Sequence, residues 1–282
     1  MTEWFPPETV DPLAYFEALV ADDQDLNLIE AAAAIAQDDD PGLDVQQVLA
    51  DLDRLGERLR ARLPADASPT HRLRLLTHFF HVELGFAGNV NDYYAAANSY
   101  LHRVLATRRG LPITLALIFM ELGSHAGLRI QGVGFPGHFL MRLSLPQGDV
   151  VLDPFSGRSL ARHELDEMLA SSGRPDLPLE MALRTLSSRQ VLARVLRNLK
   201  EVHRGGSDWH ALLAVQNRLV LLLPHDGPEL RERAQTLELL GEREAAAADL
   251  TRCLGLAASA VERRELERRL ERLRRFGGPT LH

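Results

Sequence analysis

Two residues in the middle of the chain, His138 and Asp153, are of the types that form a catalytic base and its orienting carboxylate. An aspartate that accepts a hydrogen bond from one imidazole nitrogen fixes the tautomer and raises the basicity of the other nitrogen. Such a pair normally serves a nucleophile at the start of a helix, where the helix dipole lowers the pKa of a thiol. The alternative is structural: His138 is a satisfied core histidine, and Asp153 caps a turn before a proline.

Short segments with a period of two predict the strands that carry this pair. They cover residues 129–134, 139–145 and 150–153, and the turn at 146–149 makes the last two a hairpin. If this turn centres on Gln147 and Gly148, Asp153 lies across from Arg142. His138 is then on the same face but about 13 Å away along a flat strand. A direct bond between His138 and Asp153 therefore requires a bulge, a strong twist or a shifted register.

The helix predicted over residues 113–126 is the natural place for a nucleophile. Pro112 fits its first turn, where the missing N–H costs nothing. Thr114 is the hydroxyl nearest to the helix start, and it needs a base within about 2.6–3.2 Å to attack a carbonyl. The alternative is an ordinary N-terminal threonine that bonds backbone N–H groups. Arg108 and Arg109 precede the helix and suit an anion, although a solvated charged face is the simpler interpretation.

Composition limits the classes of function. The chain has 282 residues, of which 45% are apolar and 25% charged, as in an ordinary globular protein. The net charge of −7 argues against a broad surface for nucleic acid or anionic membranes. Cys253 is the only cysteine, which excludes an internal disulfide and a zinc site built on several thiolates. Lys200 is the only lysine. The N-terminus does not resemble a signal peptide and no apolar run could span a bilayer, so a cytoplasmic protein is predicted.

Both ends of the chain have helical patterns. Apolar spacing predicts helices between residues 12 and 84, and again from about residue 187. Small and apolar residues of the tail recur at an offset of about 35 residues, which is the range of a tetratricopeptide helix pair; they are Gly206, Ala211 and Val215, repeated as Gly241, Ala246 and Leu250. Ala234 and Cys253 fall where small residues let paired helices approach, so Cys253 is interpreted as a packing residue. A generic array of helical hairpins is the alternative.

Four blocks of sequence resemble those of a known family. They are residues 98–101 (Asn-Ser-Tyr-Leu), 109–115 (Arg-Gly-Leu-Pro-Ile-Thr-Leu), 132–140 (Gly-Val-Gly-Phe-Pro-Gly-His-Phe-Leu) and 153–155 (Asp-Pro-Phe). Together they resemble the signature of the SirB-type proteins, which are bacterial transglutaminase-like proteins with C-terminal tetratricopeptide repeats. The resemblance runs from about Leu28 to the C-terminus, and the blocks around His138 and Asp153 are the most specific.

The resemblance implies an α+β fold in three parts. A helical N-terminal region (1–84) packs on a papain- or transglutaminase-like core with a small antiparallel sheet (85–183), and tetratricopeptide-like helical hairpins follow (187–282). The implied triad has a cysteine at a helix start, a histidine on one strand and an aspartate on the next. His138 and Asp153 match the last two positions, but Pro112 stands where the cysteine is expected. SirB-type proteins generally lack that thiol, so the resemblance implies a retained pair that is either vestigial or part of an altered mechanism. The blocks also make Asn98, Tyr100 and Arg109 candidate binding residues.

Two functions are open at this point. The first is a non-catalytic transglutaminase-like protein, a pseudoenzyme, that acts as a protein-binding adaptor or regulator through its cleft and its helical repeats. The alternative is a hydrolase or acyltransferase of altered mechanism that uses His138, Asp153 and either Thr114 or water. No cofactor or metal is predicted, since His78 and His81, three residues apart on one helix, lack a third ligand. The expected partner is a protein or peptide, not nucleic acid or a membrane.

Overall fold

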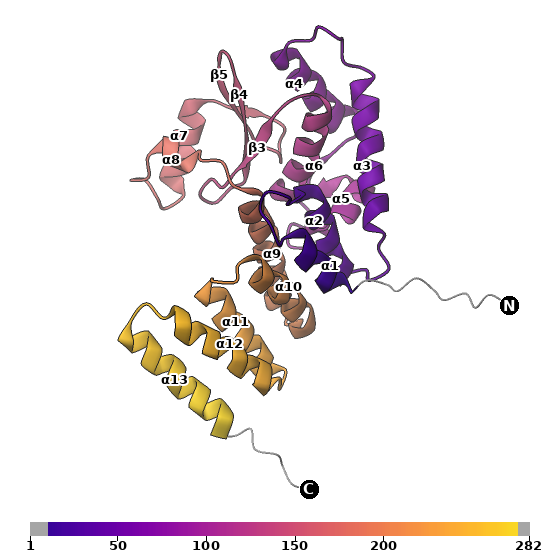
Figure 1. Cartoon of the computed structure of the whole chain (residues 1–282). Coiled ribbons are helices and arrows are strands. Elements are labelled where there is room, and N and C mark those ends of the chain that lie inside the picture. The colour runs from indigo at the N-terminus through magenta and orange to yellow at the C-terminus, as the bar shows by residue number, and fades with distance from the viewer. Residues whose placement is uncertain (1–10, 276–282) are drawn as a thin grey trace, which may run out of the picture. The chain divides into compact units, whose positions relative to one another are not determined.

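The computed structural model describes residues 11–275, which form two compact units (Figure 1). One unit spans residues 22–195, and the other combines residues 11–21 with residues 196–275. The outer ends of the predicted regions 1–84 and 187–282 lie outside the described residues. The three-part division of the chain stays a prediction, whereas the α+β fold is confirmed.

The first unit is built around α6 (Pro112–His125), a helix that is apolar on nearly every side. It contacts α3 on one side and strands β3 and β4 on another (Figure 1). The preceding helical segments are α2 (Leu28–Ala34), a 3-10 turn (Ile35–Asp38), α3 (Val45–Arg60), α4 (Pro69–His78), a π-helical turn η2 (Phe79–Glu83), a second 3-10 turn (Ala96–Ser99) and α5 (Leu101–Thr107). Asn27, Asp44 and Ser68 cap α2, α3 and α4 by accepting hydrogen bonds from backbone N–H groups.

A four-stranded antiparallel sheet holds the strands predicted from the sequence. Its order is β3 (Ile130–Val133), β4 (Leu140–Leu145), β5 (Gly148–Leu152) and β6 (Ser159–Leu160), and a separate parallel pair joins β1 (Ala87–Gly88) to β2 (Arg109–Gly110). The short strands β1, β2 and β6 were not predicted. One face of the larger sheet packs against α7 (Arg162–Ser171) and α8 (Leu179–Ala182) through a buried apolar cluster.

The hairpin between β4 and β5 has a different register from the predicted one. Leu145 pairs with Gly148, so the turn consists of Pro146 and Gln147. The proline ring fixes φ near −65° at the first turn position, and Gly148 follows with a φ of 128° that only glycine adopts readily. Because Met141 pairs with Leu152, the next position along places Asp153 opposite Leu140, only two residues from His138. The predicted pairing of Asp153 with Arg142 is therefore wrong.

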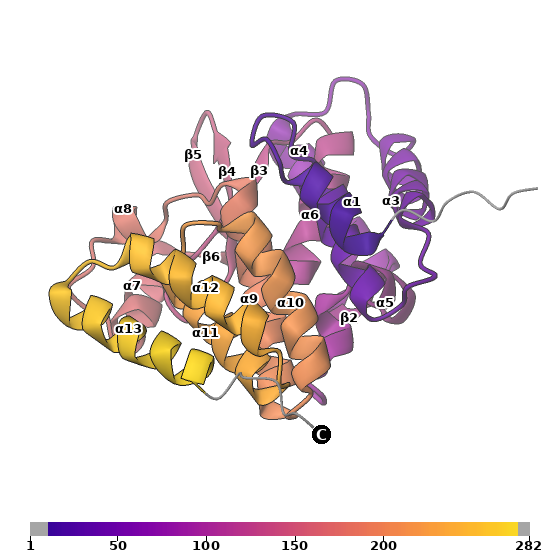
Figure 2. The ribbon, with the colours of Figure 1, turned by 60° about the horizontal axis from the view of Figure 1, so that its bottom comes forward.

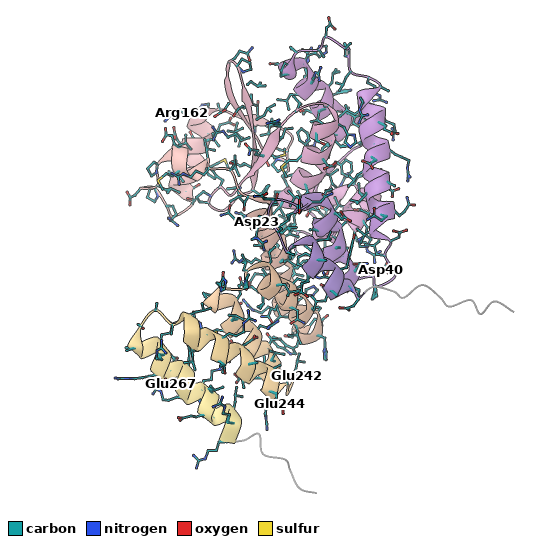
Figure 3. The ribbon with its side chains drawn as sticks, viewed as in Figure 1. Asp23, Asp40, Arg162, Glu242, Glu244 and Glu267 are labelled. Atoms are coloured by element: carbon teal, nitrogen blue, oxygen red, sulfur yellow. The ribbon has the colours of Figure 1, made fainter. Side chains whose placement is uncertain are left out.

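The second unit is helical. It contains α1 (Pro12–Leu19), the C-terminal part of α9 (Ser188–Gly205), α10 (Trp209–Leu222), α11 (Gly227–Leu239), α12 (Arg243–Leu256) and α13 (Ala260–Arg275). Helices α10 to α13 pack in sequence, each against the next (Figure 2). The turn before α12 carries Glu242 and is followed by Glu244 in the first turn of that helix (Figure 3). Helices α10 to α13 lie within the region from about residue 187 for which helices were predicted.

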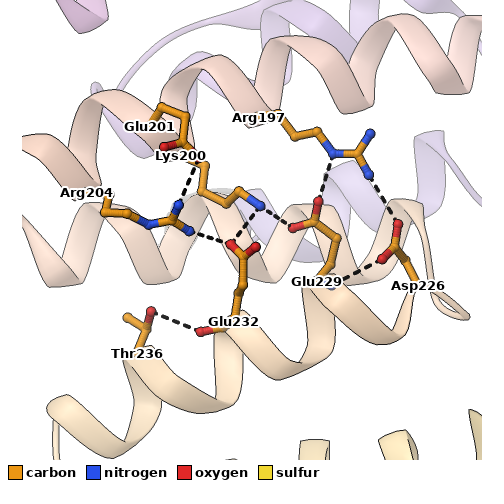
Figure 4. Close-up of polar contacts among 8 residues, drawn as sticks. All are labelled: Arg197, Lys200, Glu201, Arg204, Asp226, Glu229, Glu232 and Thr236. Carbon is orange, nitrogen blue, oxygen red and sulfur yellow. Dashed lines mark hydrogen bonds and ion pairs between the residues drawn. The ribbon is translucent and has the colours of Figure 1, made fainter. Parts of the chain in front are cut away.

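An ion-pair network joins α9 to α11 in this unit (Figure 4). Lys200 is 5% exposed, and its Nζ lies 2.7 Å from Glu229 Oε2 and 2.9 Å from Glu232 Oε2. Glu229 is 3% exposed and also accepts a hydrogen bond from Arg197 Nε at 2.8 Å. Arg204 pairs with Glu232 at the edge of the network. The only lysine of the chain is therefore a structural residue.

Cys253 lies on α12 in the apolar cluster that joins α11, α12 and α13, as predicted for a packing residue. It is 1% exposed, and burial raises the pKa of its thiol. Because only the thiolate is reactive, we expect a thiol reagent at neutral pH to leave the native protein unmodified and to modify one thiol per chain in urea. A labelling rate that is the same in the native and the denatured protein would contradict this placement.

Candidate functional site

His138 lies on an exposed turn, not in the core, so the interpretation of a buried core histidine is wrong. The turn contains Gly137 with a φ of 75°, and the backbone N–H of His138 donates to the Phe135 carbonyl at 2.9 Å. The His138 carbonyl accepts from Arg194 Nη2 at 2.7 Å. Backbone contacts thus fix the position of His138 while its imidazole faces solvent.

Asp153 closes the turn that follows β5. Its Oδ1 accepts from the backbone N–H of Phe155 at 2.9 Å, and its Oδ2 accepts from Ser156 Oγ at 2.7 Å. Within residues 11–275 no hydrogen bond or ion pair joins Asp153 to His138. The register brings the two residues close, but the carboxylate is held by its own turn, as the turn-cap interpretation requires.

The imidazole that interacts with Asp153 belongs to His81, on η2. His81 Nδ1 lies 3.0 Å from the Phe86 carbonyl oxygen, and Nε2 is buried with no hydrogen-bond partner in the described chain. Gly157 packs on the ring, since a Cβ there would lie 2.7 Å from Nε2. Burial lowers the pKa of His81, although the Phe86 carbonyl and the Asp153 charge oppose this. The sequence contained no signal for this contact, because it depends on how η2 meets the turn after β5.

The start of α6 presents no accessible nucleophile. Pro112 is the first helical residue and is half-buried. Thr114 is 0% exposed, and its Oγ1 is buried without a hydrogen-bond partner among the described residues. The expectation that this hydroxyl bonds backbone N–H groups is therefore wrong.

We expect the substitution Thr114→Val to raise the free energy of unfolding by about 1 kcal/mol, because it replaces an unpaired buried hydroxyl with a methyl group of similar size. Urea denaturation measures this change. Thr114→Ser keeps the hydroxyl and removes the methyl group, and it is expected to destabilise the protein by about 1 kcal/mol. If Thr114→Val instead abolished a measured turnover at unchanged stability, Thr114 would be the nucleophile.

The three candidate binding residues each have contacts within the fold. Asn98 is 2% exposed; its Nδ2 donates to the carbonyls of Asp92 at 2.6 Å and Tyr93 at 3.0 Å, and its Oδ1 accepts from Asn89 at 2.9 Å. Tyr100 is 3% exposed and precedes α5. Arg109 is exposed, and its Nη1 donates to the Gly85 carbonyl at 2.7 Å. Their proposed binding roles stay predictions.

An exposed aromatic surface, not predicted from the sequence, lies beside these residues. We call it the tyrosine surface and define it by Val90, Tyr93, Tyr94, His138, Phe155 and Arg194. Tyr94 is 80% exposed and Val90 74%, and the Tyr93 ring lies 5.3 Å from the Tyr94 ring and 6.3 Å from the Phe155 ring. Phe155 packs on Gly88, where any side chain would collide with the ring.

Arg194, from α9, interacts with both Tyr93 and the His138 turn. Besides its bond to the His138 carbonyl, its guanidinium lies 5.7 Å from the centre of the Phe139 ring. Burial lowers the pKa of Arg194, and the Tyr93 phenol opposes this shift. The loop at 89–95, the His138 turn and the Asp153 turn therefore share one surface with large apolar side chains and one cation.

One cluster of metal-ligating types occurs within residues 11–275, formed by Asp53, Glu121 and His125. His125 Nε2 lies 3.4 Å from Asp53 and 3.7 Å from Glu121, while Nδ1 lies 2.8 Å from Arg60 Nη2. A guanidinium can only donate, so Nδ1 is the acceptor and Nε2 carries the hydrogen. The imidazole is then neutral and faces the two carboxylates as a hydrogen-bond donor, so Nε2 has no lone pair to offer to a metal ion.

Comparison with known proteins finds a family match for each of two consecutive regions of the chain. Residues 46–197 match the transglutaminase-like superfamily, and residues 199–271 match the tetratricopeptide repeat. A UPF0162 protein of Xylella fastidiosa is 35% identical over 243 residues, 84% of this chain and 86% of that protein. A UPF0162 protein of Pseudomonas aeruginosa is 32% identical over 256 residues, 90% of this chain and 94% of that protein. Human F-box only protein 21 is 36% identical over 83 residues, 29% of this chain and 13% of that protein. No solved structure matches the chain.

Proposed function

Because the chain belongs to the transglutaminase-like superfamily and to the UPF0162 proteins, we propose that it is a non-catalytic protein-interaction module. In this proposal the tyrosine surface of the transglutaminase-like unit binds an extended peptide segment of a partner protein. The tetratricopeptide helices supply a second binding surface, as repeats of this kind generally mediate protein–protein interaction. The protein then acts as an adaptor or regulator.

The observation that carries the proposal is the start of α6. Acyl transfer needs a nucleophile with a base in hydrogen-bond reach. Pro112 has no nucleophilic atom, and the hydroxyl of Thr114 is fully buried. The exposed side chains of Tyr93 and Tyr94 favour binding over catalysis. A tyrosine offers a large contact area and loses little conformational entropy when it binds.

Several finer assignments belong to the same proposal. The SirB-type identity, the three-part domain division and a cytoplasmic location follow from the sequence blocks and composition. A protein or peptide partner, rather than nucleic acid or a membrane, follows from the net charge of −7. No helix within residues 11–275 has the length and apolar character needed to cross a membrane.

The binding proposal is tested by selecting peptides from a displayed random library against the full chain. We expect the double substitution Tyr93→Ala/Tyr94→Ala to weaken a selected peptide at least tenfold, since exposed tyrosines at the centre of an interface commonly act as hot spots. Val82→Ala is the matched control, because Val82 is 67% exposed on the same unit but lies outside the tyrosine surface. Equal affinity of all three proteins would contradict the proposal.

The enzyme alternative rests on one observation, the register that brings Asp153 within two residues of His138. It predicts turnover of an amide or ester substrate that His138→Ala abolishes without changing the melting temperature. We expect no such turnover in a screen of acyl and peptide substrates. A substrate that is hydrolysed by the wild type but not by His138→Ala would replace the binding proposal with this alternative.

A further inference from the structure

A pocket between α3 and α5 contains positive charge without an internal partner. Its volume is about 480 Å³. The residues that line it come from α3, from α5 and from the end of α5; they are Val48, Asp51, Arg54, Leu55, Arg58, His102, Leu105, Ala106 and Arg108. None of these residues belongs to the tyrosine surface, so the pocket is a separate site of the same unit.

The acid of this pocket is already neutralised. Asp51 pairs with Arg54, and its Oδ1 also accepts from Gln47 Nε2 at 2.8 Å. Arg58 and Arg108 have no ion-pair partner within residues 11–275. Their guanidinium groups lie instead over aromatic rings, 5.8 Å from the centre of Phe79 and 4.6 Å from the centre of Phe86. Two unpaired cations therefore share one pocket.

The guanidinium of Arg108 is not fully satisfied by the surrounding protein. Its Nη1 is buried and has no hydrogen-bond partner in the described chain. Burial lowers the pKa of Arg108, the charge of Arg58 lowers it further, and Asp51 opposes both. Its backbone has a φ of 61°, which is unusual for a residue other than glycine. This conformation ends α5, whereas the guanidinium is a partly buried charge without a counter-ion, which a bound anion would pair.

His102 forms part of the wall of the same pocket. Both of its ring nitrogens are buried without a hydrogen-bond partner among the described residues. Because neither nitrogen has accessible surface, the imidazole supplies no donor to the pocket, and the donors open to a ligand are those of the two arginines.

We propose that this pocket binds the phosphate group of a small molecule. Two guanidinium groups offer several N–H donors, which suit the three or four oxygens of a tetrahedral phosphate better than the two of a carboxylate. The walls formed by Val48, Leu55 and Leu105 are apolar and suit the organic part of a phosphate ester. Binding pairs the charges of Arg58 and Arg108.

Isothermal titration with inorganic phosphate, at constant ionic strength set by chloride, tests this proposal. We expect saturable binding to the full chain, in the millimolar range or tighter. Arg58→Gln and Arg108→Gln are each expected to weaken it at least tenfold, because each loses a charge-assisted hydrogen bond. Arg74→Gln, at an exposed position of the same unit outside the pocket, removes the same charge and is expected to have no effect.

A second readout separates binding from folding. Because Arg58 and Arg108 repel each other in the free protein, Arg58→Gln without phosphate is expected to melt at or above the wild-type temperature. Phosphate then raises the melting temperature of the wild type and of Arg74→Gln, but not that of Arg58→Gln. The proposal is overturned if phosphate shows no saturable binding, if all three variants bind it equally, or if acetate binds as tightly as phosphate.

Discussion

Replacing Lys200 with methionine is expected to lower the free energy of unfolding by about 3 kcal/mol. The lysine lies between Glu229 and Glu232, and both Lys200 and Glu229 are almost completely buried. Removing one member of a buried pair leaves the other charge without its partner in a medium of low dielectric. Arg197 still contacts Glu229, but its side chain is 46% exposed, so it compensates only in part. Urea denaturation followed by circular dichroism measures the loss.

The matched control is Arg204→Met, which removes a cation from the exposed edge of the same network. The side chains of Arg204 and Glu232 are 40% and 38% exposed, so this change is expected to cost less than about 1 kcal/mol. The double variant Lys200→Met/Glu229→Leu removes both buried charges and is expected to recover most of the lost stability. Equal losses for Lys200→Met and Arg204→Met, or no recovery in the double variant, would show that burial does not determine the strength of this pair.

The same network makes stability depend on pH. Burial alone would raise the pKa of Glu232, but Lys200 and Arg204 outweigh it, so the pKa is lowered. A carboxyl whose pKa is lower in the folded state contributes stability above its unfolded pKa of about 4.3, and this stability is lost as the pH falls through the folded value. We expect acid to destabilise Lys200→Met less than the wild type. Parallel loss of stability in both proteins between about pH 5 and about pH 2 would contradict this coupling.

Sequence patterns predicted most of the elements but not their register. Apolar spacing predicted helices before residue 127 and after residue 187 and three strands of the larger sheet, because periodicity depends on which face is buried. It did not predict α7, α8 or the short strands β1, β2 and β6. The hairpin register depended instead on one residue: Pro146 occupies the first turn position and moves the turn by one residue. That shift moved the position opposite Asp153 from Arg142 to Leu140, which changed its distance from His138.

For the candidate site, the sequence predicted the residues that lie within the motifs but not their contacts with the rest of the fold. His138, Asp153 and Pro112 could be identified from the motifs that contain them. The contact of His81 with the Asp153 turn, the exposure of Tyr93 and Tyr94, and the unpaired charge of Arg108 depend on segments far apart in the chain. Such features require tertiary structure, because no local pattern records which polar atom is left without a partner.

Replacing Asn98 with aspartate is the second change for which we expect a large effect, a loss of about 3 kcal/mol in the free energy of unfolding. The two side chains have the same shape. However, the Asn98 amide donates to the carbonyls of Asp92 and Tyr93, whereas a carboxylate oxygen at that position would face two other oxygens. The new charge would also be buried, since the residue is 2% exposed. Chemical denaturation measures the loss.

The consequence for function follows from the loop that Asn98 holds. Asn98 is a positioning residue, because it fixes the backbone of Asp92 and Tyr93 and so the orientation of the tyrosine surface. We expect Asn98→Asp to weaken a selected peptide as strongly as Tyr93→Ala/Tyr94→Ala, even at temperatures where the protein is fully folded. Asn91→Asp is the control, because Asn91 lies in the same loop but is exposed. If Asn98→Asp kept full affinity while folded, the peptide would not depend on the loop, and the tyrosine surface would lose its proposed role.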